Sequence, residues 1–333
     1  MKAVKAELKE AEKTRKFLVR KNYYDHDYLI EKIKKAIYFP VNKAKIPGMK
    51  VEERNLKKLK KQTMDKELKE KIPKNLHSVI PAGFDVIGDI AILEIDDKIK
   101  LYEKTIADAI LAFHKNIKTI VAKASAHEGT FRTRTYRHLA GKRTKETTHK
   151  ENDVLLNLDI EKSYFSERLS NERNRIAKQI GSNENILVMF SGVGPYVFVL
   201  AKKARHVMGI EINPDAHKYA INNKKLNKAG NADLICGDVK KIIPSLTEKF
   251  DRILMPLPKT GELFLEDAFK AIKKGGIIHF YDFVKESDFP DETLKKIESE
   301  CKKQKIKYKI LNAVKCGAYS PGHFRVCIDF TVF

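Results

Sequence analysis

The sequence lacks the features of several large protein classes. Only four of its 333 residues are cysteines, and no two of them form a Cys-x-x-Cys pair. We therefore expect buried thiols in a reducing cytoplasm, with no disulfide framework and no metal site. The longest apolar stretch, residues 186–201, is interrupted by Gly-Val-Gly-Pro and cannot cross a bilayer as a helix. Charged residues begin at Lys2, so we expect no secretory signal and no membrane contact.

Acidic residues are also scarce relative to basic ones. Lys and Arg number 66 against 44 Asp and Glu, which gives a formal net charge of +22. Residues 1–75 hold 23 basic and 11 acidic side chains, and residues 123–150 hold eight basic and two acidic ones. A polyanion is the expected partner, although a lysine-rich composition can also reflect a hot or salty habitat. The basic excess in the front half predicts that this half grips the substrate.

Residues 186–238 follow the order of a nucleoside-binding half-fold. An apolar strand is followed by a turn with Gly192 and Gly194, the next strand ends on Glu211, and a third is followed by Asp238. In such a fold the glycines let the backbone approach the ligand, and the acid after the second strand binds ribose hydroxyls. An acid after the third strand can face the amine of an adenine.

The glycine turn argues against a dinucleotide. A third glycine would complete that fingerprint, but Val197 occupies its position, and Pro195 removes an N–H group that a pyrophosphate would use. S-adenosyl-L-methionine has no phosphate and needs only the ribose-binding acid, so we predict this cofactor. The alternatives are a nicotinamide cofactor and a Gly-x-Gly that merely turns the chain.

We expect three domains and a linker. Residues 1–48 are expected to form a small domain that opens with a charged helix over the first twenty residues, and residues 49–75 a basic linker or exposed helix. Residues 76–150 are expected to form a middle domain, in which residues 84–93 form a bent strand and residues 132–141 the last strand. Residues 151–333 are expected to bind the cofactor.

The last domain is predicted to be a doubly wound, seven-stranded Rossmann-type sheet, so that the whole chain is α/β with two small α/β domains in front. After Asp238 we expect a strand over 250–255, a helix over 263–274 ended by two glycines, and a strand over 277–283. Two final strands, near 307–314 and 325–333, are expected to add the antiparallel pair typical of methyltransferases.

Four segments together resemble the archaeal and eukaryal class I tRNA (guanine37-N1)-methyltransferases. Residues 84–91 (FDVIGDIA) are similar to the middle-domain signature of that family, and residues 164–175 (YFSERLSNERNR) to the entry of its catalytic domain. Residues 190–195 and 211–214 are similar to its cofactor loops. The resemblance covers nearly the whole chain. It implies methylation of the guanine beside the anticodon by a cytoplasmic protein, expected to be a monomer, that contacts the anticodon loop and the elbow of tRNA.

The resemblance also implies site residues. Guanine N1 carries a proton, so the enzyme needs a base near N1 and a positive group near O6. Glu172 matches the general base of the family, Tyr164 lies in the same motif, and Arg132, or else Arg134, matches the cationic group. The residues expected at the cofactor are Arg173, Phe190, Gly192, Gly194, Glu211, Ile212, Asp238, Val239 and Pro256.

Simpler interpretations exist for these charged residues. Glu172 among arginines is also typical of an ion pair on a helix, and clustered arginines are often phosphate contacts. Two positions depart from the usual family pattern: Val188 stands where most relatives have an acid, and Pro256 stands where most have an asparagine at the target base.

A proline at this second position resembles an archaeal branch of the family that also methylates C7 of the demethylated wyosine precursor. A bifunctional enzyme is therefore the first alternative. A non-catalytic RNA-binding protein and another RNA methyltransferase are more distant ones.

Overall fold

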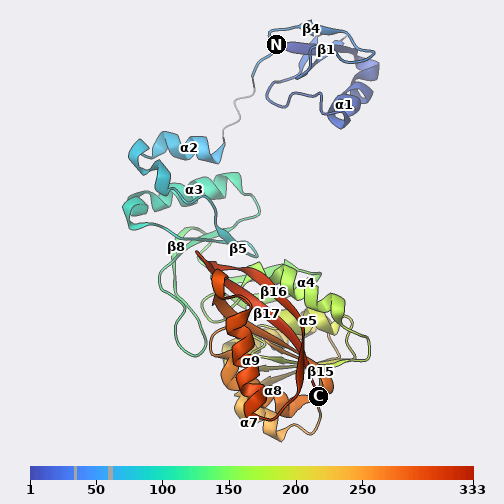
Figure 1. The fold of residues 1–333 in the computed structure, drawn as a ribbon. Helices are drawn as coiled ribbons and strands as arrows, with labels where there is room; N and C mark the ends of the chain where they lie inside the picture. Colours follow the sequence, from blue (N-terminus) through green and yellow to red (C-terminus); the bar gives the residue numbers. More distant parts are fainter. Residues whose placement is uncertain (34–35, 59–62) are drawn as a thin grey trace. The chain divides into compact units, whose positions relative to one another are not determined.

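The computed structural model describes residues 1–33, 36–58 and 63–333, which separate into two compact units, residues 1–71 and 72–333 (Figure 1). In the first unit, four antiparallel strands have the order β2-β3-β1-β4. Their bounds are Lys2–Glu7 (β1), Glu31–Ile33 (β2), Ala36–Pro40 (β3) and Val51–Glu53 (β4), and the helices are α1 (Ala11–Arg20) and α2 (Met64–Lys71).

The expected helix over the first twenty residues is therefore wrong at its start. Residues 2–7 form the strand that pairs with both β3 and β4. Val4 and Ala6 are buried while Lys5 and Glu7 are exposed, an alternation that suits a strand covered on one face. The expected linker also contains one element of this sheet, β4, and residues 59–62 of it lie outside the described part.

The second unit begins with a four-stranded sheet in the order β5-β6-β7-β8, covered by a helix. Its elements are η2 (Lys74–Val79), β5 (Asp85–Ile87), β6 (Ile90–Leu93), η3 (Asp97–Tyr102), α3 (Glu103–Phe113), β7 (Thr119–Lys123) and β8 (Tyr136–Gly141). The segment expected as one bent strand is a hairpin. Its turn needs a glycine, because Gly88 has a φ of +58° and an added Cβ would lie 2.1 Å from Oγ1 of Thr147.

The strand expected over 132–141 begins only at Tyr136. The preceding residues close a loop: the N–H of Ala124 donates to the carbonyl oxygen of Thr135 at 3.0 Å, and the N–H of Glu128 donates to that of Thr133 at 2.9 Å. Arg132 has a φ of +53° within it. Residues 132–135 of the expected strand thus belong to this loop, defined here as residues 124–135.

A β-hairpin leads into the last part of the unit. It consists of β9 (Glu146–Glu151) and β10 (Val154–Asp159), joined by Asn152 and Asp153 with positive φ angles of 43° and 57°. The free edge of β10 is satisfied by side-chain amides, since Asn223 and Asn227 each accept from one backbone N–H and donate to one carbonyl of this strand.

The remaining strands form the predicted seven-stranded sheet, in the order β13-β12-β11-β14-β15-β17-β16. The pairs from β13 to β15 are parallel, and β17 is antiparallel to both β15 and β16, which confirms the methyltransferase arrangement. The strands are β11 (Asn185–Met189), β12 (His206–Glu211), β13 (Ala232–Cys236), β14 (Phe250–Met255), β15 (Ile272–Lys285), β16 (Tyr308–Ser320) and β17 (His323–Val332).

Helices cover both faces of this sheet (Figure 1). They are η4 (Glu167–Leu169), α4 (Ser170–Gln179), α5 (Pro195–Ala201), α6 (Pro214–Leu226), α7 (Val239–Ile242), η5 (Ile243–Ser245), η6 (Gly261–Phe264), α8 (Leu265–Ala271), η7 (Glu286–Asp288) and α9 (Asp291–Lys303). Among the helices that the structure describes, none combines the length and apolar character that a membrane span requires.

The side chains of β11 explain why both faces are covered. Leu187 and Met189 join the core beneath α7, α8 and α9, whereas Ile186 and Val188 join the core beneath α4 and α5. Successive residues of a strand point to opposite faces, so a continuous apolar run requires a cover on each. Because both faces are covered, the expected binding place for a ligand is the edge of the sheet where the parallel strands end.

The ends of one helix and of the final hairpin differ from expectation. The helix expected over 263–274 ends at Ala271, because Ile272 pairs with Phe250 and β15 begins there. The final hairpin is longer than expected, since β16 runs to Ser320 and β17 starts at His323. This extension carries the hairpin, paired with the end of β15, beyond the end of β14 at Met255.

Candidate active site

Two adjoining cavities open where β11, β12 and β14 end. The smaller, which we call the inner cavity, has a volume of about 170 Å³ and is lined by the loops after these strands. The larger, the outer cavity, measures about 1250 Å³ and lies between the loop 124–135, the 164–169 segment and the tip of the β16–β17 hairpin. Residues from several elements line both: Thr130, Arg132, Tyr164, Phe165, Ser166, Leu169, Leu257 and Phe264.

Glu211 provides a buried carboxylate at the inner cavity. Its Oε2 accepts from the N–H of Gly192 at 2.7 Å, and its Oε1 accepts from the N–H of Asn213 at 2.8 Å. Burial raises the pKa of Glu211, and these backbone N–H groups oppose that rise. Each oxygen has a further lone pair, so the fixed carboxylate can accept from a pair of neighbouring hydroxyls.

Other polar groups of the inner cavity suit a nucleoside better than a phosphate. Ser191 also lines the cavity, but its hydroxyl is buried toward Gly209 and has no hydrogen-bond partner among the described residues. Asp238 accepts from the N–H of Lys240 at 2.9 Å and caps α7 beside the cavity. Pro195 occupies the first turn of α5, where it offers no N–H. The cavity thus presents carboxylate acceptors rather than a row of donors.

The residues expected at the cofactor gather around this cavity, with one exception. Gly194 is not among its lining residues: it has a φ of +89°, and an added Cβ would lie 2.2 Å from the ring of Phe198, so its role is to turn the chain. The others that line it are Arg173, Phe190, Gly192, Glu211, Ile212, Asp238, Val239 and Pro256.

Arg173 is 1% exposed and builds the wall of the inner cavity. Its guanidinium bonds to both carboxylate oxygens of Glu151, and Nη2 also donates to the carbonyl oxygen of Ser166 at 2.9 Å. It lies over the rings of Phe165 and Tyr196 at 5.3 and 5.8 Å. These bonds hold the 164–166 segment in place between the two cavities.

Tyr164 stands where the two cavities meet. The edge of the His127 ring lies against its ring, with centroids 5.1 Å apart, and the guanidinium of Arg132 lies 5.5 Å from it. Its hydroxyl accepts a hydrogen bond from Nη2 of Arg325 at 2.8 Å. A ring held on these sides by the loop 124–135 and the last strand is well placed to contact a ligand of either cavity.

The two candidate arginines are placed differently. Arg132 lines both cavities, whereas Arg134 lines the outer cavity alone. Partial burial and the charge of nearby Arg134 lower the pKa of His127 to about 4. The neutral ring donates through Nδ1 to the carbonyl oxygen of Arg132 at 2.8 Å, which fixes the loop around both arginines.

Glu172 lies behind the inner cavity and is not among the lining residues of either cavity. Its carboxylate is 4% exposed and forms two bonds with Arg175, of 2.7 and 2.8 Å. Oε1 also accepts from the hydroxyl of Tyr281 at 2.7 Å, and this hydroxyl accepts from that of Tyr196 at 3.0 Å. Since Tyr196 lines the inner cavity, two hydroxyls connect the cavity wall with the carboxylate.

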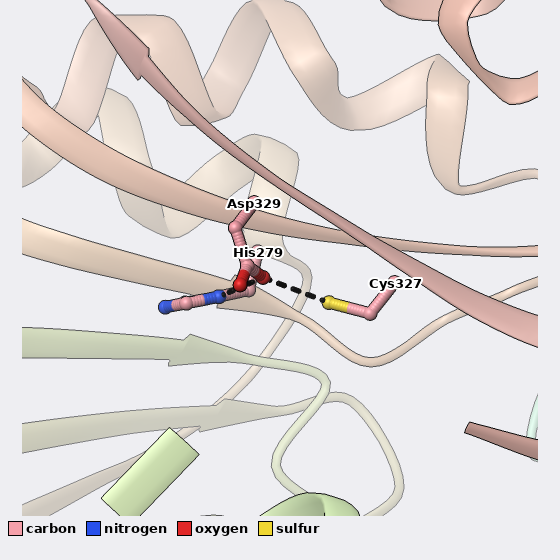
Figure 2. A group of neighbouring side chains, drawn as sticks. All are labelled: His279, Cys327 and Asp329. Carbon is pink, nitrogen blue, oxygen red and sulfur yellow. Dashed lines mark hydrogen bonds and ion pairs between the residues drawn. The ribbon is translucent and has the colours of Figure 1, made fainter. Parts of the chain in front are cut away.

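A buried group of His279, Cys327 and Asp329 is compact enough to suggest a metal site (Figure 2). Its bonds describe an ion-pair cluster instead. His279 donates through Nδ1 to Asp329 at 2.6 Å, and its Nε2 accepts from Arg252 at 2.8 Å. Arg175 pairs with the same aspartate at 2.6 Å. Both ring nitrogens are thus committed, and two guanidinium groups would repel an added cation.

Several residues at the cavities had no role in the sequence analysis. Phe264 packs edge to face against the expected Phe190 beside the inner cavity, with centroids 4.8 Å apart, and Leu257 lies on the border with the outer cavity. Arg325 is the largest omission. An arginine within an apolar strand gives no sequence signal of its own, and only the pairing of β17 brings it to the cavity.

Three family models match consecutive parts of the chain between residues 3 and 311. A family model described as the TRM5/TYW2 methyltransferase domain matches residues 147–311. The TYW2 N-terminal domain matches residues 64–144, and the tRNA methyltransferase 5 N-terminal domain matches residues 3–49.

Individual proteins are similar over most of the chain. The tRNA (guanine(37)-N(1))-methyltransferase Trm5b of Pyrococcus abyssi is 39% identical over 99% of this chain and 98% of its own length. The tRNA (guanine(37)-N(1))/4-demethylwyosine(37)-methyltransferase Taw22 of Nanoarchaeum equitans is 32% identical over 71% of this chain and 97% of its own.

Solved structures agree with these matches. The crystal structure of Pyrococcus abyssi Trm5b superposes with a TM-score of 0.84 at 39% identity, over 100% of this chain and 99% of that one. The complex of aTrm5 with tRNALeu superposes with a TM-score of 0.79 at 30% identity, over 99% of this chain and 99% of that one. Methanocaldococcus jannaschii TYW2 in complex with AdoMet gives 0.57 at 26% identity, over 75% of this chain and 99% of that one.

Proposed function

We propose that this chain, which belongs to the TRM5/TYW2 methyltransferase family, moves the methyl group of S-adenosyl-L-methionine to N1 of guanosine 37 in tRNA. One observation carries the proposal. A cavity with the acceptors that a nucleoside needs adjoins a larger, basic cavity, and Tyr164 lies between them. The similarity to tRNA (guanine(37)-N(1))-methyltransferases over nearly the full length supports the choice of substrate.

The inner cavity fits S-adenosyl-L-methionine. Glu211 is the proposed acceptor for the ribose hydroxyls, and Asp238 is the proposed partner of the adenine amine, because both line the cavity at the ends of neighbouring strands. When bound, the cofactor supplies a methyl group on a positively charged sulfur, which needs only in-line placement against its acceptor.

The outer cavity fits the target nucleotide of an RNA. The basic side chains that line it are Lys123, Arg132, Arg134, Arg168, Lys259 and Arg325. Carboxylates hold two of them, since Lys123 pairs with Glu94 at 2.7 Å and Arg168 with Asp85 at 2.6 Å. Arg132, Arg134, Lys259 and Arg325 form no ion pair within 4.0 Å among the described residues, so they are the cations available to a nucleotide.

The chemistry follows from this placement. The N1 electron pair of guanine forms the new bond to the methyl carbon, the carbon–sulfur electrons stay on sulfur, and the N1 proton leaves. Negative charge develops at O6 as that proton leaves, and we assign its stabilisation to Arg132 or Arg134. Tyr164 is proposed to orient the base, because its ring borders both cavities.

Glu172 is the proposed acceptor of the N1 proton. In the structure its carboxylate is bonded to Arg175 and Tyr281, behind the cavity wall. The proton therefore reaches it in one of two ways: through the hydroxyls of Tyr196 and Tyr281, or directly after substrate binding separates Glu172 from Arg175. Only the first route needs the hydroxyl of Tyr281, so the variant Tyr281→Phe distinguishes the two.

The division of labour along the chain is also a proposal. We assign residues 1–48 to the tRNA elbow, residues 49–75 to a linker, residues 76–150 to the catalytic arginine and RNA contacts, and residues 151–333 to the cofactor. The three family models, with matches at 3–49, 64–144 and 147–311, support this division. We further propose that the protein acts as a cytoplasmic monomer on the anticodon loop.

A second activity has specific support. Pro256 lines the inner cavity where most relatives carry an asparagine, and Taw22, whose name joins both substrates, is 32% identical. We propose that the enzyme also accepts tRNA with the 4-demethylwyosine base at position 37. Methyl uptake by such a tRNA tests this directly, and its absence would remove the second activity.

The deciding experiment is transfer of labelled methyl from S-adenosyl-L-methionine to an unmodified tRNA transcript with guanosine at position 37. The matched control is the same transcript with adenosine there. Label on the first transcript alone is the expected result. Label on neither transcript would reject the guanosine substrate, whereas equal label on both would place the target at another position.

A further inference from the structure

Arg325 is a buried cation that faces the outer cavity without a carboxylate partner. It lies on β17 opposite Phe283 of β15 and Gly317 of β16, near the tip of the long hairpin. Its side chain lines the outer cavity although the residue is only 9% exposed. Within the described residues, no ion pair within 4.0 Å satisfies it.

The three other deeply placed arginines of this region differ from it. Arg173 pairs with Glu151, Arg175 with Glu172 and Asp329, and Arg252 with Glu184. A buried charge without such a partner costs free energy, which a protein tolerates where a ligand later provides the partner. The contrast therefore separates Arg325 from the structural ion pairs around it.

The contacts of Arg325 leave one edge of the guanidinium available. Nη2 donates to the hydroxyl of Tyr164 at 2.8 Å, and the guanidinium lies 5.3 Å from the centre of the Phe283 ring. The Nε atom is buried without a hydrogen-bond partner, whereas Nη1 makes no hydrogen bond among the described residues and is not one of the buried unpaired atoms. A guanidinium has five N–H donors in a rigid plane, so it can hold Tyr164 and at the same time donate to an acceptor in the cavity.

The same bond fixes the role of Tyr164. A hydroxyl has one proton and accepts through its lone pairs. Because Arg325 donates to the oxygen of Tyr164, the phenolic proton is left to be donated elsewhere. The hydroxyl lies at the border of the two cavities, so the direction left to this proton includes the ligand side.

We propose that Arg325 and Tyr164 act as a donor pair for one acceptor oxygen of the nucleotide at position 37. Arg325 contributes an N–H of Nη1, and it also holds the Tyr164 hydroxyl so that its proton points to the same ligand. The proposal rests on the proposed function for the identity of the substrate. It adds a substrate-binding residue from the C-terminal hairpin to the arginines of the loop 124–135.

The test compares Arg325→Met, Arg325→Lys, Tyr164→Phe and the double variant Arg325→Met/Tyr164→Phe with the native enzyme. Arg205→Met is the matched control, since Arg205 is exposed and lines neither cavity. The readouts are the single-turnover rate of methyl transfer at saturating tRNA and cofactor, cofactor affinity by calorimetry, and the thermal midpoint of unfolding.

We expect Arg325→Met to lower the single-turnover rate about 10- to 100-fold, the effect of one lost charged hydrogen bond. Cofactor affinity should stay within about threefold of the native value. The double variant should be scarcely slower than Arg325→Met alone, because the two residues act as a unit. Arg325→Lys should recover part of the rate, since lysine keeps the positive charge but lacks the planar set of N–H donors of a guanidinium. A native rate in Arg325→Met, or additive losses in the double variant, would overturn the proposal.

Two further measurements keep the outcome clear. If Arg325→Met fails to fold, the coupling with Tyr164→Phe is measured in the Arg325→Lys background instead. Binding to tRNA with guanosine at position 37 is also compared with binding to the same tRNA without a base there. Arg325→Met should lose affinity for the first tRNA alone. Equal, salt-dependent losses for both would make Arg325 a phosphate contact and reject the proposal. A native enzyme that methylates no G37 transcript would refute the proposed function and leave this binding test standing.

Discussion

Glu172 and Arg175, three residues apart on α4, form a salt bridge with two parallel bonds of 2.7 and 2.8 Å. The pair is continued by Asp329, which bonds to the other side of the same guanidinium at 2.6 Å. Arg175 is therefore shared between a residue proposed to take part in catalysis and a structural cluster of the sheet. In this arrangement the proposed base lies behind the cavity wall, bonded to Arg175 and Tyr281.

The substitution Glu172→Gln should keep cofactor binding and lose most of the turnover. Glutamine preserves the shape of the side chain but cannot accept the N1 proton, and removal of a general base costs about 10²- to 10⁴-fold. The measurement is the single-turnover rate beside calorimetric affinity for S-adenosyl-L-methionine. A comparable loss of affinity would assign Glu172 a structural role.

Tyr281→Phe distinguishes the two proton routes. If the proton travels through the hydroxyls of Tyr196 and Tyr281, the rate should fall nearly as far as in Glu172→Gln. If Glu172 leaves Arg175 and reaches the base directly, Tyr281→Phe should keep a rate within about threefold of the native one. Thermal unfolding of each variant controls for the lost hydrogen bond, which is worth about 1 kcal/mol.

Arg132→Ala and Arg134→Ala should have different kinds of defect, one in the rate of methyl transfer and the other in tRNA binding. The arginine at O6 should lose about 10²- to 10³-fold in rate with little change in tRNA affinity, as for other oxyanion donors. The other should weaken tRNA binding modestly and in a salt-dependent way. Rates at saturating tRNA and affinities at two salt concentrations test this. Equal, salt-dependent binding losses in both variants would make both residues phosphate contacts.

Gly192→Ala and Gly194→Ala form a matched pair, because both glycines have positive φ angles. At Gly194 an added Cβ meets the Phe198 ring at 2.2 Å, so this variant should lose about 1–3 kcal/mol of stability. At Gly192 the nearest atom is 3.7 Å away, and the residue lines the inner cavity. This variant should keep more stability and lose at least about tenfold in cofactor affinity. Urea unfolding and calorimetry separate the effects, and the reverse pattern would contradict the assignment.

Stability should fall as the pH is lowered below about 6.5. Burial lowers the pKa of His279. As the pH falls, this histidine is therefore protonated at a higher pH in the unfolded chain than in the folded protein, which favours unfolding. Burial opposes ionisation of Asp329, but the bonds from His279 and Arg175 outweigh it and hold its pKa below the ordinary range. The ionised aspartate therefore contributes stability above about pH 4, which is lost on further acidification.

Each of these groups adds a slope of up to about 1.4 kcal/mol per pH unit within its window. The measurement is the free energy of unfolding in urea from pH 7 to pH 3. His279→Gln should flatten the curve between pH 6.5 and 5, whereas His323→Gln, at the tip of the hairpin, serves as the control. The same slope in His279→Gln as in the native protein would refute this account.

Local patterns were enough for the cofactor half of the protein. The apolar run of β11, the turn at Gly192 and the acids Glu211 and Asp238 are set by backbone conformation and by burial on both sides of a strand. Such features depend on neighbours in the sequence, so they can be read without the structure. The positive φ of Gly194 is local as well, but the ring of Phe198 that excludes a side chain there is known only from packing.

The substrate half was decided by the tertiary structure. Arg325 and Tyr164 are 161 residues apart, and no periodicity predicts that β17 brings them into contact. Likewise, an ion pair within α4 can be read from the spacing of Glu172 and Arg175, but its junction with Asp329 depends on where the sheet passes. The sequence by itself determined which segments form the strands of the cofactor domain and which type of cofactor it binds, because both follow from local hydrophobicity and backbone angles. Only the fold decided which buried charges pair with each other and which one stays available for a ligand, because that depends on contacts between distant segments.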